Sequence, residues 1–253
     1  MQIDLNADAG ESFGAWKLGN DEALFDFIST VNVACGFHAG DPLTIQKTLE
    51  LAKQKSVAVG AHPGYPDLVG FGRRVLAATP EQVYADVLYQ LSALAGFAKV
   101  VGLPLRHVKA HGALANESWK NVETAHAIAK ATQDFDANLP LMVLPKTLLE
   151  VEAHKLNMPV VLEAFPERAY LKNAQLAPRS IKNSSIHDPA EAARRAVMMV
   201  KEKRIEALGG GWVDFDVQSL CIHGDNPHAV EIAKEIREAL EAEGITVQTF
   251  SKP

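Results

Sequence analysis

Short apolar runs alternate along the chain with segments of helical periodicity. Each run stops at a glycine, a proline or a polar cluster, which is typical of buried parallel strands. The segments between the runs repeat their apolar residues with a period of about 3.6, as amphipathic helices do. We therefore expect strands near 2–7, 30–35, 57–61, 106–110, 139–143, 159–163, 218–222 and 245–250, and helices over 43–55, 80–101, 116–133, 145–154, 189–203 and 227–242.

Helix-start signals support these boundaries. Asp41 precedes Pro42, and Asn226 precedes Pro227, so each pair combines a capping side chain with a proline in the first helical position. We interpret Asp41 mainly as a helix cap and not as a functional carboxylate.

Strict alternation of strands and helices predicts a parallel sheet with right-handed crossovers. Seven or eight such units in 253 residues favour a (β/α) barrel over an open sheet. No linker-like stretch interrupts the pattern, so we expect a single domain over 1–253. Two connecting segments, 62–78 and 164–188, are longer than ordinary loops, and long loops in compact domains are often functional.

Charge and composition argue against several functional classes of protein. The net charge is −6 and no long basic run occurs, which argues against nucleic-acid and membrane-surface partners. The sequence holds no signal-peptide pattern and no apolar stretch long enough for a membrane span. The two cysteines suggest no disulfide framework. We therefore expect a cytoplasmic globular protein.

Reactive side chains gather where the predicted strands end, which is where α/β barrels build active sites. Side chains alternate across a strand, so the polar parity of each strand should face the barrel lumen while the apolar parity faces the helices. A buried charge costs several kcal/mol unless it is paired, so a chain that keeps many is expected to use them. This parity places in one lumen Asp8, His62, Lys109, Glu163 and His223.

Further candidates lie in the loops after the strands. Glu11 belongs to an Asp-Ala-Gly-Glu turn, and His38 has no evident structural role in its glycine-rich loop. Arg73 and Arg74 stand beside glycines, where guanidinium groups suit a carboxylate or a phosphate. The catalytic candidates are Asp8, Glu11, His38, His62, Lys109 and His111. The substrate-binding candidates are Asn6, Asn32, Arg73, Arg74, Glu163, Arg168, His223 and Asp225.

Purely structural roles remain possible interpretations for several of these residues. Glu163 and Arg168 could form no more than an ion pair at a strand exit. Asp225 either caps a loop or orients His223. The five other histidines, including His107, are interpreted as structural or surface groups.

Six sequence motifs of this chain resemble those of the LamB/YcsF family, both in their residues and in their order along the chain. They are DLNADAGE, NVACGFHAGDP, GAHPGYPDLVGFGRR, VKAHGALAN, EAFPERAY and HGDNPHA. The resemblance implies an irregular (β/α) barrel of about seven parallel strands, of the kind found in the glycoside hydrolase/deacetylase superfamily. It implies ATP-dependent opening of 5-oxoproline to L-glutamate by the A subunit of a 5-oxoprolinase, in a complex with subunits B and C, and leaves a homo-oligomer open.

The sequence departs from the family pattern at two sites. The family's KPHGALYN is here Lys109-Ala110-His111-Gly112-Ala113-Leu114-Ala115-Asn116, which keeps the lysine, histidine and asparagine. The family's FADR is here Phe165-Pro166-Glu167-Arg168, so the shape of that loop is expected to differ.

An ATP-coupled lactam hydrolase needs cations for a phosphoryl group and a carboxylate, and Arg73, Arg74 and Lys109 are candidates. Asp8, Glu11 or a neutral histidine could activate water, and His62 or His111 could protonate the ring nitrogen.

Two other functions remain open. In a metal-dependent amide hydrolase or deacetylase, Asp8, His38 and His62 would bind a divalent metal, although the deacetylase-like HxxxH spacing is missing. The third interpretation is a non-catalytic subunit that binds a small acid and regulates its partners.

Overall fold

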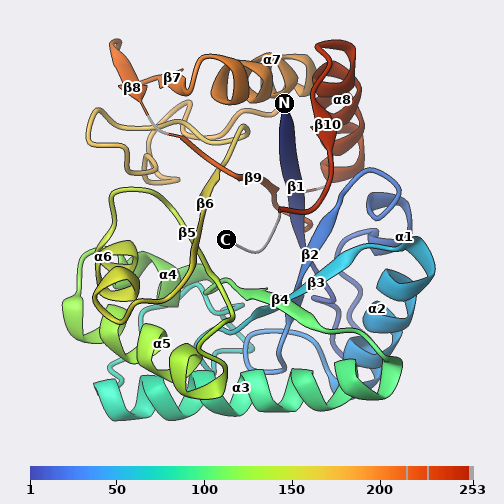
Figure 1. The fold of residues 1–253 in the computed structure, drawn as a ribbon, viewed down its shortest axis with the longest axis vertical. Coiled ribbons are helices and arrows are strands. Elements are labelled where there is room, and N and C mark those ends of the chain that lie inside the picture. Colours follow the sequence, from blue (N-terminus) through green and yellow to red (C-terminus); the bar gives the residue numbers. More distant parts are fainter. Residues whose placement is uncertain (215, 227, 251–253) are drawn as a thin grey trace.

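Seven parallel strands close into a barrel in the computed structural model, which describes residues 1–214, 216–226 and 228–250 (Figure 1). Neighbouring strands pair in the order β1-β2-β3-β4-β5-β6-β9, and pairing of β9 with β1 closes the circle. The predicted barrel of about seven strands is confirmed. The barrel strands are β1 (Gln2–Ala9), β2 (Thr30–Ala34), β3 (Ala58–His62), β4 (Leu105–Val108), β5 (Leu141–Val143), β6 (Val160–Ala164) and β9 (Ser219–Ile222).

Helices surround the barrel, and the start signal at Asp41 behaves as the sequence predicts. The Asp41 carboxylate accepts hydrogen bonds from the backbone N–H groups of Leu43 and Thr44, and it caps the helix that starts at Pro42. Thr79 and Gln82 form the two reciprocal bonds of a capping box. The helices are α1 (Asp21–Leu24), α2 (Pro42–Lys55), α3 (Pro80–Val101), α4 (Gly112–Ser118), α5 (Val122–Phe135), α6 (Leu148–Lys155), α7 (Pro189–Lys201) and α8 (Ala229–Ala242).

The structure corrects four expectations. The segment expected as a strand at 245–250 gives the short β10 (Thr246–Val247), which pairs with the start of β1 and adds no strand to the closed barrel. The helix expected over 116–133 is two helices, α4 and α5, because Asn121 caps a new helix start. An unpredicted hairpin of β7 (Arg204–Glu206) and β8 (Trp212–Asp214) follows α7. The last helix begins at Ala229 with His228 as its N-cap, not with the expected Asn226, and Pro227 lies outside the described residues.

Strand parity separates an apolar outer layer from a polar lumen. In β1, the buried side chains of Ile3, Leu5 and Ala7 belong to the hydrophobic core. The alternate residues, Asp4 and Asn6, are also buried and make hydrogen bonds to side chains of neighbouring strands. The lumen therefore holds a hydrogen-bonded polar network. At the carboxyl ends of the strands, the lumen opens into the candidate site. Among the described helices, none is long and apolar enough to cross a membrane.

Candidate functional site

A cavity of about 490 Å³ opens at the carboxyl ends of the barrel strands. Its size suits a small-molecule ligand. Polar and ionisable groups line one part, and apolar side chains such as Trp119, Met142, Leu144 and Leu176 line another. The residues that the sequence assigned to one lumen do meet here: the cavity is lined by Asp8, His62, Lys109, Glu163 and His223, and also by His111.

Lys109 lies at the centre of the site. Its ammonium is 3.1 Å from Asp8 Oδ1, 3.2 Å from Glu163 Oε2 and 2.8 Å from the sulfur of Cys221. Burial alone would lower the pKa of Lys109, but Asp8, Cys221 and Glu163 raise it well above its ordinary value. Burial raises the pKa of Glu163, and Lys109 offsets part of that effect. The site thus contains a charged, desolvated ammonium held between two carboxyl groups.

Asp8 is the carboxylate of this group. Burial would raise its pKa, but His62 and Lys109 hold it well below the ordinary value. Oδ1 accepts a 2.8 Å hydrogen bond from Asn32, and Oδ2 lies 3.5 Å from His62 Nε2. Asn32 also donates to Asn6 Oδ1 over 2.7 Å. Asn6 and Asn32 do not line the cavity, so they orient Asp8 from beneath and the structure does not place them against a ligand.

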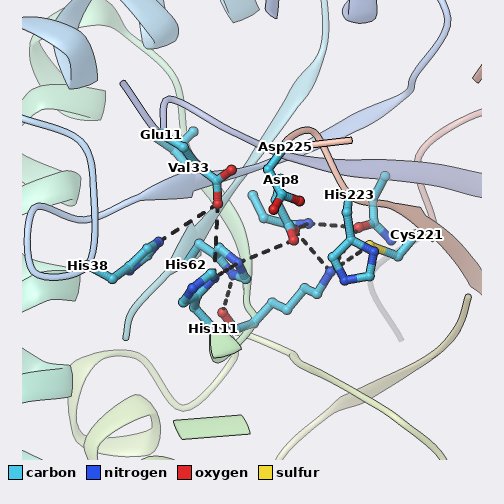
Figure 2. Close-up of polar contacts among 12 residues, drawn as sticks. Asp8, Glu11, Val33, His38, His62, His111, Cys221, His223 and Asp225 are labelled. Atoms are coloured by element: carbon cyan, nitrogen blue, oxygen red, sulfur yellow. Dashed lines mark hydrogen bonds and ion pairs between the residues drawn. The ribbon is translucent and has the colours of Figure 1, made fainter. Parts of the chain in front are cut away.

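A second cluster of Glu11, His38, His62 and His111 adjoins Asp8 (Figure 2). The rings of His38 and His111 stack at 3.7 Å, and Glu11 Oε1 lies 4.0 Å from a ring nitrogen of each. Both nitrogens of the buried His38 lack a hydrogen-bond partner among the described residues. The left-handed Gly72 allows this packing, because a Cβ there would be 2.7 Å from Cβ of His38 and 2.8 Å from His111 Cδ2.

Hydrogen bonds fix which ring nitrogens carry protons in this cluster. His62 Nδ1 donates to the carbonyl of Lys109 over 2.7 Å, and His111 Nε2 donates to the carbonyl of Phe71 over 2.8 Å. Burial, and then His62, lower the pKa of His111 to about 3, so its ring is neutral. Its Nδ1 lone pair points at His62 Nε2, 3.0 Å away. A proton or a metal cation must lie between these two nitrogens for the contact to be favourable.

These donors fit a divalent metal. One ligand atom from each of Glu11, His38, His62 and His111 lies within 4.8 Å of all the others. Imidazole and carboxylate ligands suit zinc and related transition metals. Burial, and then Asp8 and Asp225, raise the pKa of Glu11 well above its ordinary value, as expected for a carboxyl group without its counter-ion. The cluster differs from the predicted set of Asp8, His38 and His62, because Asp8 pairs with Lys109.

The loops that follow β6 and β9 contribute a pair of interacting ionisable side chains, Glu167 and His223. His223 Nδ1 binds Glu167 Oε1, and its ring stacks on Phe165 at 5.4 Å. Asn226 donates to the other oxygen of Glu167 over 3.3 Å. Of the two roles left open for Asp225, the pairing with His223 does not form: Asp225 accepts a 2.6 Å hydrogen bond from Arg73 instead.

Two predicted substrate-binding arginines make other contacts. Arg74 pairs with Asp67, its side chain is largely exposed, and it does not line the cavity. Arg168 lines the cavity, but it donates to the carbonyls of Ser184 and Ala177, so it also holds the long loop after β6 in place. Sequence reasoning missed Glu167, and the one available signal was its place in the long segment 164–188.

The comparisons with known proteins agree with this geometry. Residues 3–253 match the LamB/YcsF family. A protein of Thermus thermophilus that is named as the A subunit of 5-oxoprolinase is 59% identical over 99% of this chain and 100% of its own. The crystal structure of a lactam utilization protein from Thermus thermophilus superposes with a TM-score of 0.96, at 58% identity over 99% of this chain and 100% of that one.

A more distant solved structure shares the fold alone. A family 4 carbohydrate esterase from Streptomyces lividans gives a TM-score of 0.50 at 11% identity, over 99% of this chain and 93% of that one. With the family matched from end to end and a relative 59% identical, the chain belongs to the LamB/YcsF family.

Proposed function

We propose that this protein is the A subunit of an ATP-dependent 5-oxoprolinase, which opens 5-oxoproline to L-glutamate in the cytoplasm together with subunits B and C. The observation that carries the proposal is the buried Lys109 ammonium between Asp8 and Glu163, at the floor of a cavity of small-molecule size. It stands in a chain whose 59% identical relative is named for this activity.

The chemistry explains the need for ATP. A lactam is an amide with a poor leaving group, and its carbonyl resists water. Transfer of a phosphoryl group to the carbonyl oxygen gives an imidoyl phosphate, which water attacks at carbon. Cleavage of the C–N bond then gives γ-glutamyl phosphate, and a second water releases phosphate. The sum is 5-oxoproline, ATP and two waters to glutamate, ADP and phosphate.

The residues of the cavity suit these steps. Lys109 and Arg73 offer positive charge to the substrate carboxylate and the phosphoryl group. Asp8, with its lowered pKa, or Glu11 accepts a proton from the attacking water. Asn32 holds Asp8 in position, and Asn6 holds Asn32.

The decisive experiment mixes this protein with its two partner subunits and measures glutamate released from 5-oxoproline with ATP. We expect Asp8→Asn and Lys109→Ala to abolish turnover while leaving the circular dichroism spectrum unchanged and the thermal transition cooperative. Activity retained by a folded double variant would overturn the assignment. Omission of each partner in turn tests the requirement for the complex.

A second candidate is a metal-dependent amide hydrolase, and the observation that favours it is the cluster of Glu11, His38, His62 and His111. A divalent metal there would act as a Lewis acid toward a carbonyl or a bound water. The chain's own contribution would be to orient His62 and His111 through the carbonyls of Lys109 and Phe71.

Metal analysis of protein purified without chelator separates the two candidates. A bound metal should be present in near-stoichiometric amount. It should be lost in a His38→Ala variant, because the ring nitrogens of His38 have no other partner among the described residues. ATP-independent amide hydrolysis that stops on chelation would support the second candidate. Protein free of metal and active with ATP would exclude it.

A further inference from the structure

His223 is held in one orientation by contacts from three directions. Glu167 Oε1 binds Nδ1 of the ring and also accepts a 3.3 Å hydrogen bond from the His223 backbone N–H. Asn226 donates to Glu167 Oε2, and the Phe165 ring supports one face of the imidazole. Glu167 is buried, with about 4% of its surface exposed, so this pairing is shielded from water. A buried carboxylate on Nδ1 fixes the orientation of the ring and places a negative charge beside it.

The other nitrogen of His223 is available to a ligand. Nε2 lies across the ring from Glu167, makes no hydrogen bond among the described residues, and belongs to a side chain that lines the cavity. Figure 2 shows this ring beside Asp8, on the side away from His38 and His111. Burial would raise the pKa of Glu167, but His223 and Asn226 hold it below its ordinary value, so Glu167 stays ionised.

The other histidines in or beside the cavity are less suited to donate a proton. The Nδ1–H of His62 is bound to the Lys109 carbonyl, and the Nε2–H of His111 to that of Phe71. Their other nitrogens face each other across 3.0 Å and belong to the cluster with Glu11. His38 is wholly buried and does not line the cavity.

Protonation of the ring nitrogen decides the outcome of the proposed reaction. After water adds to the imidoyl phosphate, the tetrahedral carbon carries a hydroxyl, a phosphate and the ring nitrogen. If phosphate leaves, the lactam is regenerated and ATP is wasted. If a proton reaches the nitrogen as the hydroxyl loses its own to a base, the C–N bond breaks and γ-glutamyl phosphate forms. An acid at the nitrogen therefore couples ATP consumption to ring opening.

We propose that His223 Nε2 is the acid that protonates the leaving ring nitrogen, with Glu167 as its positioning residue, so that this pair sets the coupling between ATP use and glutamate formation. The inference rests on the proposed 5-oxoprolinase activity. It moves the acid from His62 or His111 to a residue that sequence reasoning assigned to substrate binding.

The test measures ADP and glutamate formed by the reconstituted complex with 5-oxoproline and ATP. The wild type should form about one ADP per glutamate. His223→Gln should lower glutamate formation about 10²- to 10⁴-fold, the usual contribution of a general acid. ADP formation dependent on 5-oxoproline should fall far less, so the ratio of ADP to glutamate should rise at least about tenfold. A structural defect would lower both rates together.

Oxygen-isotope exchange tests the same choice between loss of phosphate and cleavage of the C–N bond. Loss of phosphate from the tetrahedral carbon leaves the oxygen of water in the lactam. In ¹⁸O-water, 5-oxoproline recovered from the His223→Gln reaction should therefore contain solvent oxygen, and that recovered from the wild type should contain little. Glu167→Gln should raise the ADP to glutamate ratio in the same direction, and Glu167→Asp should partly restore coupling.

A matched control is available on the surface. His228 forms an exposed pair with Glu231 at 3.2 Å and does not line the cavity, so His228→Gln should keep the wild-type ratio. Wild-type coupling in both His223→Gln and Glu167→Gln would overturn the inference alone. Absence of glutamate from the wild-type mixture would overturn the proposed function, and the inference with it.

Discussion

At the scale of single residues, the lumen shows how a barrel interior carries charge. Its ionisable side chains are buried but paired or hydrogen-bonded: Lys109 with Asp8 and Glu163, and Asp4 with the hydroxyls of Ser29, Thr30 and Ser219. Pairing more than offsets the effect of burial on the pKa values of Lys109 and Asp8. For Asp4 and Glu163, burial outweighs the hydrogen bonds and ion pairs, and the pKa stays raised. Asp4, which lies at the opposite end of β1 from Asp8, contributes to pH-dependent stability without touching the cavity.

Asp4→Asn should change the pH dependence of stability. Burial raises the pKa of Asp4 from 3.8 to about 6, so the folded state binds a proton that the unfolded state releases. The stability that this group contributes is present below about 3.8 and is lost as the pH rises through about 6. The unfolding free energy of the variant relative to the wild type should therefore increase between about pH 4 and 7, by up to about 3 kcal/mol. Urea unfolding measures it, and a decrease would contradict the argument.

Arg73 and Arg74 form a natural matched pair. Arg73 bonds to Asp225, covers the Phe71 ring at 5.0 Å and lines the cavity, whereas Arg74 pairs with Asp67 outside it. We expect Arg73→Ala to reduce kcat/KM for 5-oxoproline in the reconstituted complex by about ten- to hundredfold, the value of one or two charge-assisted hydrogen bonds. Arg74→Ala should stay close to the wild type. Equal losses in both variants would argue for a general electrostatic effect.

At the scale of elements, the connection between β2 and α2 joins stability to the site. The loop carries His38 into the histidine cluster, and Asp41 closes it by capping α2. The Asp41 carboxylate also accepts hydrogen bonds from the Thr44 hydroxyl and the Gly14 backbone N–H, which ties the loop after β1 to the same helix. The Asp41 side chain thus fixes two loops, one carrying Glu11 and the other carrying His38, of the cluster with His62 and His111.

Asp41→Ala should destabilise the protein by about 1 kcal/mol, since that is the typical value of an N-cap. Asp41→Asn retains an acceptor and should lose much less. Chemical denaturation of the two variants provides the measurement. A destabilisation of the same size in both would show that charge, and not the capping hydrogen bond, carries the effect.

At the scale of the whole molecule, closure of the barrel creates the site. Pairing of β9 with β1 and β6 brings Cys221 and His223 to residues near the start and the middle of the chain. The interior is close-packed: a Cβ on Gly60 of β3 would meet the ring of His107 at 2.1 Å. His107 in turn contacts Asn32 Oδ1, so β2, β3 and β4 are joined across the lumen.

Gly60→Ala should therefore cost about 1–3 kcal/mol or more of folding stability through overpacking. Gly96→Ala is the matched control: it lies within α3, a Cβ there meets nothing within 4 Å, and it should stabilise the protein by up to about 1 kcal/mol. Thermal unfolding of the two variants should shift the midpoint in opposite directions. A neutral Gly60→Ala would mean that the lumen is less tightly packed than the structure shows.

Much of the fold follows from local signals in the sequence. The alternation of apolar runs and amphipathic segments predicted the seven strands and most helix boundaries, because burial on both faces of a parallel strand requires a continuous apolar run. Residue parity put Asp8, His62, Lys109, Glu163 and His223 into one cavity, since side-chain direction in a strand depends on position alone. β10 was misjudged because an apolar run does not say which strand it will pair with.

Partner choice between side chains was decided by the tertiary structure. Glu167 and His223 are 56 positions apart, and Arg73 and Asp225 are 152 apart. No local pattern links either pair. The same holds for the cluster of Glu11, His38, His62 and His111, which the side-by-side pairing of β1, β2, β3 and β4 assembles from four separate strand ends. The sequence by itself determined which residues face the lumen, because that is a local property of strands. Which of them pair, and which remain free for a ligand, depended on how distant loops pack.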